Sequence, residues 1–112
     1  VGTEFTFDRD LTTRFAVIAE LYKIEKELMS RLDESEASGR TVTLKIKFSD
    51  FRQITRSRTL QAYIRDFDTL HRTVTAIRRS IDLTGTRIRL MGVSVSNLET
   101  EDTGERQLEF LF

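Results

Sequence analysis

The fold is decided by one stretch near the middle of the chain, Thr41-Val42-Thr43-Leu44-Lys45-Ile46-Lys47-Phe48. Apolar residues occupy every second position, and threonine or lysine occupies the positions between them. Because side chains alternate between the two faces of a β-strand, this period of two predicts a half-buried strand. The apolar residues then point towards a core, and the threonines and lysines point towards water or a partner.

Two more strands are predicted on either side of this stretch. After a turn over residues 49–52, the threonine-rich run over residues 53–60 pairs with it as a hairpin. Near the start of the chain, residues 2–7 alternate in the same way, with Phe5 on the inward phase. The chain starts with Val1 in the middle of this pattern, so we expect a module of a longer protein.

The last strand is predicted over residues 87–98 and contains a change of phase. Its apolar residues occupy one phase before Met91-Gly92 and the other phase after it, which is typical of a β-bulge. With the bulge there, four apolar side chains reach the core: Ile88, Leu90, Val93 and Val95. Three polar side chains share the solvated face: Arg89, Ser94 and Ser96.

Two helices are predicted between these strands. The first covers residues 12–37, is capped by Thr12 or Thr13, and is closed by Ser38-Gly39 with the glycine in the left-handed conformation. Its apolar positions recur every three or four residues, with Glu25 in the one polar gap: Phe15, Ile18, Leu21, Tyr22, Leu28, Met29 and Leu32. The second helix covers about residues 66–81, with Asp66 or Asp68 near its amino end. Its stripe is Phe67, Leu70, Val74, Ile77 and Ile81.

The order strand, helix, strand, strand, helix, strand defines the fold class. It predicts an α+β fold with a four-stranded mixed sheet and both helices on one face, a split β-α-β layout. We expect one domain over residues 1–98, an acidic linker over 99–106, and a terminal peptide over 107–112 on a flexible tail. The two-layer arrangement leaves one sheet face open, and function is expected there.

Composition excludes several classes of protein. The 112 residues make one domain, and 32% of them are charged. No run approaches the roughly 18 apolar residues that span a bilayer, so we expect no membrane partner. The absence of cysteine removes disulfides and thiol chemistry, and His71 as the only histidine argues against a histidine-based metal site or triad.

The formal charge of zero hides a separation of charge along the chain. Residues 39–60 and 85–98 carry eight basic residues and the single acid Asp50, a net charge of +7. The rest carries 10 basic and 17 acidic residues, a net charge of −7. Lysine, arginine and hydroxyl side chains suit a sugar-phosphate backbone, but they also simply solvate an exposed sheet. Both interpretations stay open here, whereas base stacking is disfavoured because Phe5 and Phe48 point inwards.

Three segments carry a resemblance to a known family. They are Gly39-Arg40-Thr41-Val42-Thr43-Leu44-Lys45, Asp50-Phe51 with Thr55-Arg56-Ser57-Arg58-Thr59-Leu60, and Ile88-Arg89-Leu90-Met91-Gly92-Val93-Ser94-Val95-Ser96-Asn97-Leu98. In this order and spacing they resemble the carboxy-terminal little finger domain of Y-family DNA polymerases, most of all the bacterial DNA polymerase IV type. The resemblance covers nearly the whole chain.

The resemblance implies an accessory domain that holds both backbones of primer–template duplex DNA in the major groove. Carried onto this sequence, it implies these DNA-binding residues: Thr43, Lys45, Lys47, Thr55, Arg56, Ser57, Arg58, Thr59, Arg87, Arg89, Ser94 and Ser96. Alternation puts Arg56 and Arg58 on the helix side, so either a twist or bulge turns them out or they reach phosphate around the sheet edge. Leu90 departs from the family, where some members have a second arginine, and we expect a weaker grip there.

The resemblance also bears on catalysis. It implies a parent translesion DNA-directed DNA polymerase of the bacterial cytoplasm, whose palm domain binds Mg²⁺. We expect no catalytic residue, metal or cofactor in this chain, and a monomer. The acidic pairs Asp8 with Asp10 and Asp66 with Asp68 lie at the ends of predicted elements, where capping explains them. A ferredoxin-like RNA-binding or small-molecule regulatory module is the alternative function.

The terminal peptide is a second functional signal. It resembles the motif that binds the bacterial sliding clamp, and the implied clamp-binding residues are Gln107, Leu108, Phe110, Leu111 and Phe112. After an acidic linker, its apolar side chains would otherwise form an exposed patch. Docking in a partner groove would bury them, whereas packing back onto the domain is the alternative. Whether Leu111 with Phe112, or Phe110 with Phe112, fills the deep pocket stays open.

Overall fold

The computed structural model describes residues 1–99 of the 112-residue chain. The elements follow one another as strand β1 (Gly2–Leu11), helix α1 (Arg14–Glu34), strands β2 (Gly39–Phe48) and β3 (Gln53–Thr59), helix α2 (Phe67–Arg79) and strand β4 (Ile88–Leu98). The predicted fold class and element order are therefore confirmed. The predicted terminal peptide and most of the linker lie outside the described residues.

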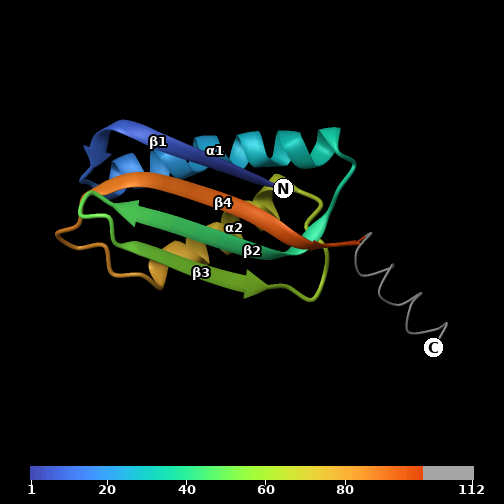
Figure 1. The fold of residues 1–112 in the computed structure, drawn as a ribbon. Coiled ribbons are helices and arrows are strands. Elements are labelled where there is room, and N and C mark those ends of the chain that lie inside the picture. Colours follow the sequence, from blue (N-terminus) through green and yellow to red (C-terminus); the bar gives the residue numbers. More distant parts are fainter. Residues whose placement is uncertain (100–112) are drawn as a thin grey trace.

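The four strands form one sheet in the order β1-β4-β2-β3 (Figure 1). All three neighbouring pairs are antiparallel, so the expectation of a mixed sheet was wrong. The reason lies in the two helical crossovers. Each crossover joins parallel strands that are separated by one intervening strand, β4 between β1 and β2, and β2 between β4 and β3. Parallel strands therefore never become neighbours.

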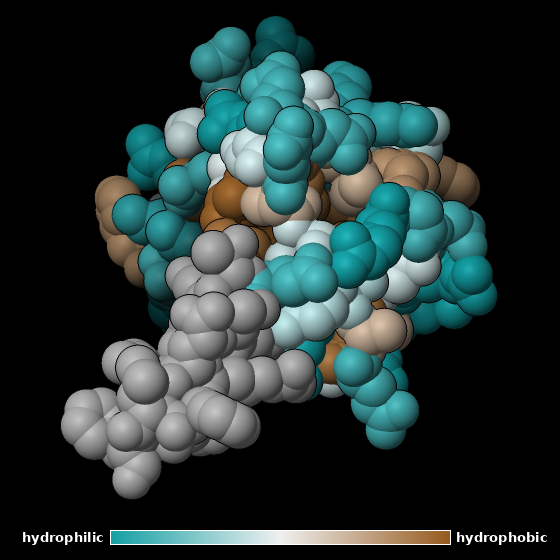
Figure 2. All heavy atoms as spheres, turned by 90° about the vertical axis from the view of Figure 1, so that its right-hand side faces the viewer, coloured by the Kyte–Doolittle hydropathy of each residue, from teal (hydrophilic) through white to brown (hydrophobic). Residues whose placement is uncertain are grey.

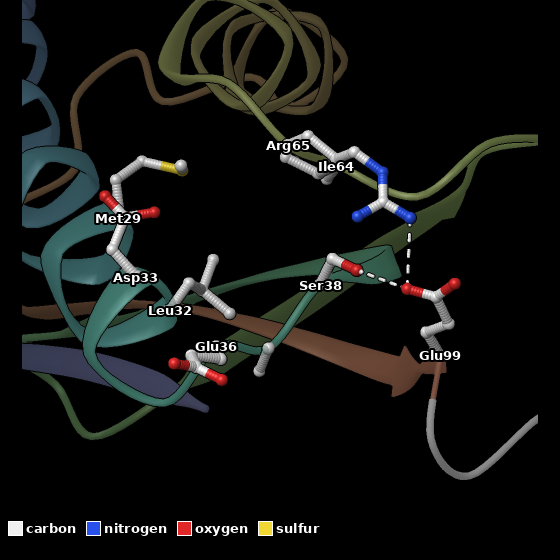
Figure 3. A pocket seen from close by; sticks show the side chains of 9 residues that line it. Met29, Leu32, Asp33, Glu36, Ser38, Ile64, Arg65 and Glu99 are labelled. Carbon is white, nitrogen blue, oxygen red and sulfur yellow. Dashed lines mark hydrogen bonds and ion pairs between the residues drawn. The ribbon is translucent and has the colours of Figure 1, made fainter.

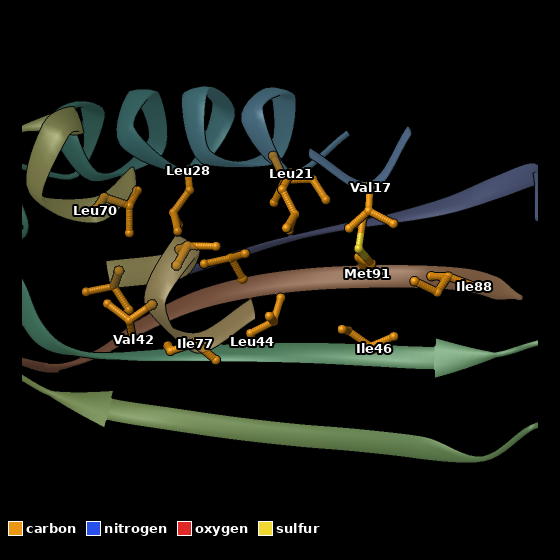
Figure 4. Close-up of a cluster of buried hydrophobic side chains, with 14 of the residues drawn as sticks. Val17, Leu21, Leu28, Val42, Leu44, Ile46, Leu70, Ile77, Ile88 and Met91 are labelled. Atoms are coloured by element: carbon orange, nitrogen blue, oxygen red, sulfur yellow. The ribbon is translucent and has the colours of Figure 1, made fainter. Parts of the chain in front are cut away.

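Both helices cover the same face of the sheet, as predicted, and the core fills the space between the two layers (Figure 4). Leu44 and Met91 from the sheet and Leu28 and Leu70 from the helices are fully buried there. The other sheet face carries no helix, and Figure 1 looks onto it. None of the helices within residues 1–99 is long and apolar enough to cross a membrane.

The amino ends of both helices are capped as the sequence predicts. The Thr13 side chain accepts a hydrogen bond from the backbone N–H of Ala16 at 3.2 Å. The Asp66 side chain accepts one from the N–H of Thr69 at 3.0 Å and another from the Thr69 hydroxyl. The bond from the hydroxyl and the bond from the N–H together lower the pKa of Asp66. Side-chain oxygens at this position satisfy backbone donors that the helix itself leaves free.

The apolar stripe predicted for α1 was wrong in part. Phe15 is 80% exposed, and Ile18 and Tyr22 are also exposed, whereas Val17 and Ile24 are buried. The helix carries two apolar stripes side by side, and each has the spacing of three or four residues. Periodicity alone cannot tell which of the two faces the sheet, so the packing of β4 and α2 decides it.

Gly39 does not close α1, contrary to the prediction. The helix ends at Glu34 with Ser35 as its C-cap, and Glu36 takes the left-handed conformation with φ 52°. Gly39 instead begins β2, where a β-carbon would lie 2.5 Å from Val95 Cγ1 and 2.6 Å from the Ser96 carbonyl oxygen. The glycine is therefore required for the close approach of β2 and β4.

The irregularity in β4 lies at Arg89 rather than at Met91-Gly92. Lys47 pairs with Leu90 and Phe48 with Ile88, so Arg89 is the extra residue on β4. Met91 is consequently buried in phase with Val93, and Leu90 shares the open face with Lys47 instead of reaching the core. The phase change in the sequence was correctly recognised, but the apolar character of Leu90 hid its position.

Candidate nucleic-acid interface

The open face of the sheet brings together most of the residues implied as DNA-binding. Strand register places its side chains in four rows across the sheet. In the order β1-β4-β2-β3, these rows are Ser96–Thr41–Thr59 (without a β1 residue), Gly2–Ser94–Thr43–Ser57, Glu4–Gly92–Lys45–Thr55 and Thr6–Leu90–Lys47–Gln53. One half of the face therefore carries hydroxyl groups, and the other half carries the lysines.

The hydroxyl half is joined by hydrogen bonds between neighbouring strands. The hydroxyls of Thr41 and Thr59 lie 2.8 Å apart, as do those of Thr43 and Ser57. Asn97 adds a donor, with its amide nitrogen 2.6 Å from Thr41 Oγ1. In each hydroxyl pair one group donates to the other, so one O–H per pair stays free for a further acceptor. The paired side chains are held in place before any ligand arrives.

The cationic half is built around the exposed ring of Phe51, in the turn between β2 and β3. Lys47 Nζ lies 5.6 Å and the Arg89 guanidinium carbon 5.4 Å from the ring centroid. Phe51 is 68% exposed and has a φ of 71°, a left-handed conformation that is strained for a bulky residue. The ring thus holds two cations beside each other, at the place where the extra residue of β4 turns Arg89 towards Lys47.

Glu4 adds a negative charge to this face, which the sequence analysis missed. Its carboxylate accepts a hydrogen bond from Lys45 Nζ at 3.1 Å, and both side chains are partly exposed. Strand β1 is separated from β2 by β4, so nothing in the local sequence indicates that Glu4 and Lys45 meet. The glycine between them, Gly92, leaves room for the pair across β4.

Arg56 and Arg58 do not share the open face. They pair with Leu44 and Val42, and the register from Thr41 to Lys47 is regular, so no bulge turns them out. Both are exposed because β3 is the edge strand. Of the two alternatives left open by the sequence, only an approach to a ligand around the sheet edge fits this register.

Two further basic residues of the positively charged segments are held in ion pairs. Arg87 lies 3.4 Å from Asp10, and Arg52 lies 2.7 Å from Asp50. The Arg52 backbone N–H and side chain hold the pKa of Asp50 below its usual value. Arg87 therefore lies beside an acid just before β4, apart from the four rows. The net charge of +7 is spread over the face, the edge and these pairs rather than concentrated on one surface.

The opposite layer contains a buried acid. Glu25 of α1 is 1% exposed and lies 2.6 Å from His71 Nδ1 of α2. Burial raises the pKa of Glu25, and the bond to His71 opposes this rise. Within residues 1–99, three or more histidine, cysteine, aspartate or glutamate residues nowhere form a group that could hold a metal ion.

The described chain ends beside a hollow between α1 and the β3–α2 connection (Figures 2 and 3). Glu99 accepts hydrogen bonds there from the Ser38 hydroxyl at 3.2 Å and from Arg65 at 3.0 Å. The hollow measures about 280 Å³, and Met29 and Ile64 are among the side chains that line it. Figure 2 shows apolar surface at this end of the molecule, surrounded by hydrophilic side chains. These bonds fix the point from which residues 100–112 continue.

Comparison with known proteins agrees with the fold. The family described as impB/mucB/samB family C-terminal domain matches residues 1–110. DNA polymerase IV of Bacteroides fragilis (strain YCH46) is 39% identical over 116 residues, which cover 100% of this chain and 32% of that protein. DNA polymerase IV of Clostridioides difficile (strain 630) is 44% identical over 73 residues, 65% of this chain and 20% of that protein. The chain thus spans about a third or less of the length of these curated relatives.

Solved structures share the fold. A complex of beta-clamp processivity factor and the little finger domain of PolIV superimposes with a TM-score of 0.71 at 25% identity, covering 88% of each chain. DinB from Sulfolobus solfataricus gives a TM-score of 0.73 at 14% identity, covering 87% of this chain and 28% of that one, and shows the fold alone. The family match, the relatives and the sheet topology lead to one assignment: the chain belongs to the impB/mucB/samB family as its C-terminal domain, the little finger domain of a Y-family DNA polymerase.

Proposed function

We propose that the chain grips the backbone of duplex DNA with its open sheet face. The observation that carries this proposal is the pairing of ordered hydroxyl rows with Lys45, Lys47 and Arg89 on the one sheet face that no helix covers. Hydroxyls and cationic side chains both bind phosphate oxygens, and neither reads the bases in that contact. The grip is therefore independent of DNA sequence.

On this geometry we assign different phosphate contacts to different parts of the sheet. Lys47 and Arg89, held at Phe51, meet one stretch of backbone, while the hydroxyl half donates to phosphates further along the sheet. Arg56 and Arg58 contact phosphates around the edge of β3. Phe51 stands alone at a turn rather than in a row across the sheet, so base stacking of the RNA-recognition type is not supported. Membership in the family of Y-family little finger domains also favours DNA binding over the alternative function, a ferredoxin-like RNA-binding or small-molecule regulatory module.

We further propose that the chain serves a parent DNA-directed DNA polymerase that copies damaged templates. The relatives are named DNA polymerase IV, and this chain corresponds to about a third of their length or less. Mg²⁺ would be bound by the parent's palm domain, and this domain would hold the product duplex while that site works. Localisation in the bacterial cytoplasm and a monomeric state stay predictions.

The DNA proposal is tested by binding of a fluorescent duplex at several salt concentrations. If about five phosphates are contacted, the logarithm of affinity should fall with the logarithm of salt at a slope of about −4 to −5. The double substitution Lys47→Ala with Arg89→Ala should reduce this slope by about two and weaken all duplex sequences alike. Lys23→Ala with Arg72→Ala removes the same charge from the helices and serves as the matched control. Equal losses in both variants, or a strong sequence preference in the loss, would overturn the proposal.

We also propose that residues 107–112 bind the bacterial sliding clamp. The support is the sequence motif, together with the relative whose little finger domain is solved in complex with a beta-clamp processivity factor. Tethering at the clamp raises the local concentration of the domain at the primer end without new chemistry.

Surface plasmon resonance on an immobilised bacterial clamp tests the clamp proposal. Removing residues 107–112 should abolish binding, while affinity for duplex DNA stays within about twofold. Phe110→Ser and Leu111→Ser, tested singly, then show which of the two fills the deep pocket. Undiminished clamp binding by the shortened chain would refute the assignment.

A further inference from the structure

Three arginines of the helical layer differ from several other basic residues of that layer in that they form no ion pair within residues 1–99. Lys23, Arg31 and Arg72 each form an ion pair with an acid three or four residues away on the same helix. Arg14, Arg78 and Arg79 form no ion pair and no side-chain hydrogen bond with any residue of the described part of the chain, 1–99. We call these three the arginine cluster.

The arginine cluster lies where α1 begins and α2 ends, far from the point where β4 leaves the domain (Figure 1). All three arginines line one hollow of about 400 Å³, and Arg78 and Arg79 also line a second hollow of about 180 Å³ between the helices. Partial burial and the nearby charges of Arg79 and Arg14 lower the pKa of Arg78. Three like charges therefore meet at one place. Two acids lie near them: Asp82 lines the larger hollow, and Glu25 lines the smaller one and partly offsets the charge at Arg78.

The position of Arg14 is not explained by helix stability. It is the first residue of α1, where the helix dipole disfavours a positive charge, and the first turn contains no acid. A cation in this position costs stability unless an anion accompanies it. The arrangement is therefore better suited to a bound acidic group than to the free domain.

Apolar side chains lie next to the arginine cluster. Phe15 is 80% exposed and Ile18 is 37% exposed, and Ile18 also lines the smaller hollow with Val74. In the larger hollow, Val17 and Ile81 line the wall beside the arginines. An exposed phenylalanine beside unpaired guanidinium groups resembles the composition of protein–protein contact sites, where aromatic residues and arginine dominate the binding energy.

We propose that the arginine cluster and its two hollows form a docking site for an acidic segment of another protein, one that carries an apolar or aromatic side chain. The arginines would bind the carboxylates, and the smaller hollow, which Ile18 and Val74 line, would take the apolar side chain. A carboxylate-bearing peptide fits better than a nucleic acid backbone because phosphate and sugar offer no apolar group for Phe15 and Ile18. This site lies on the layer opposite the open face, so a partner would dock while the sheet holds DNA.

The test uses the complete 112-residue chain and two fluorescein-labelled synthetic peptides, one of aspartate, leucine and phenylalanine, the other with serine in place of both apolar residues. Fluorescence polarisation should show binding of the apolar peptide and about tenfold weaker binding of the serine peptide. Arg14→Gln with Arg79→Gln should weaken binding of the apolar peptide about tenfold. Phe15→Ser, at an exposed position, should weaken it as well without affecting the fold.

Lys23→Gln with Arg72→Gln is the charge-matched control and should leave peptide affinity within about twofold. An equal loss in this control, or equal binding of both peptides, would reduce the site to general electrostatics and overturn the proposal. Loss of duplex DNA affinity in the Arg14 and Arg79 variant alone would assign the cluster to nucleic acid instead. Binding seen only after removal of residues 100–112 would assign it to the chain's own segment, and self-association in ultracentrifugation would assign it to a second copy.

Discussion

The two faces of β2 differ completely although they belong to the same ten residues. On the face towards the helices, Val42, Leu44 and Ile46 are fully buried. On the open face, Thr41 and Thr43 form hydroxyl pairs with β3, and Lys45 meets Glu4. Stability and binding are thus separated residue by residue along one strand. A substitution on one face should leave the property of the other face almost unchanged.

The largest expected effect is the loss of stability on the inner face. Leu44→Ala creates a cavity beneath both helices and should lower the free energy of unfolding by about 2–5 kcal/mol in urea denaturation. Thr43→Ala, its neighbour on the open face, removes one hydroxyl pair and should cost about 1 kcal/mol or less. A similar cost for both substitutions would show that the two faces are not separated in this way.

The second prediction concerns the buried acid of the helical layer, Glu25. Because the folded-state pKa of Glu25 is raised, its contribution to stability is present below the unfolded value of about 4.3 and is lost as pH rises through the folded value. Glu25→Gln removes this loss. At neutral pH the variant should be the more stable of the two proteins, and the difference should vanish near pH 4. Thermal unfolding as a function of pH measures it, and a constant difference at all pH values would contradict the assignment to Glu25.

The smallest effect concerns the open face. Glu4→Gln removes the acid that pairs with Lys45 and frees this lysine for phosphate. Affinity for duplex DNA should rise about two- to fivefold at low salt, less at high salt, because the pair is exposed and screened. Fluorescence anisotropy measures the change, with Asp68→Asn on the helical layer as the control, since Asp68 also pairs with a basic residue, Arg72. Weaker DNA binding by Glu4→Gln would mean that the carboxylate orients Lys45 rather than competing for it.

Local patterns in the sequence determined a large part of this fold. The strict alternation of residues 41–48 predicted correctly which side chains of β2 are buried, because a strand has only two faces. The sequence narrowed each helix cap to two residues, Thr12 or Thr13 and Asp66 or Asp68, because a side-chain oxygen there reaches the N–H three residues on. The structure selects Thr13 and Asp66. The resemblance to the family followed from contiguous segments, and the family match confirms it.

The tertiary structure alone decided which of two apolar stripes on α1 is buried, where the extra residue in β4 lies, and which charges meet. Glu4 reaches Lys45 across β4, Arg89 joins Lys47 at Phe51, and the arginine cluster gathers residues from both helices. In each case the partners are distant in sequence or come from different elements, so no local period relates them. Spacing along the chain determines the faces of single elements, whereas contacts between elements depend on how the layers pack.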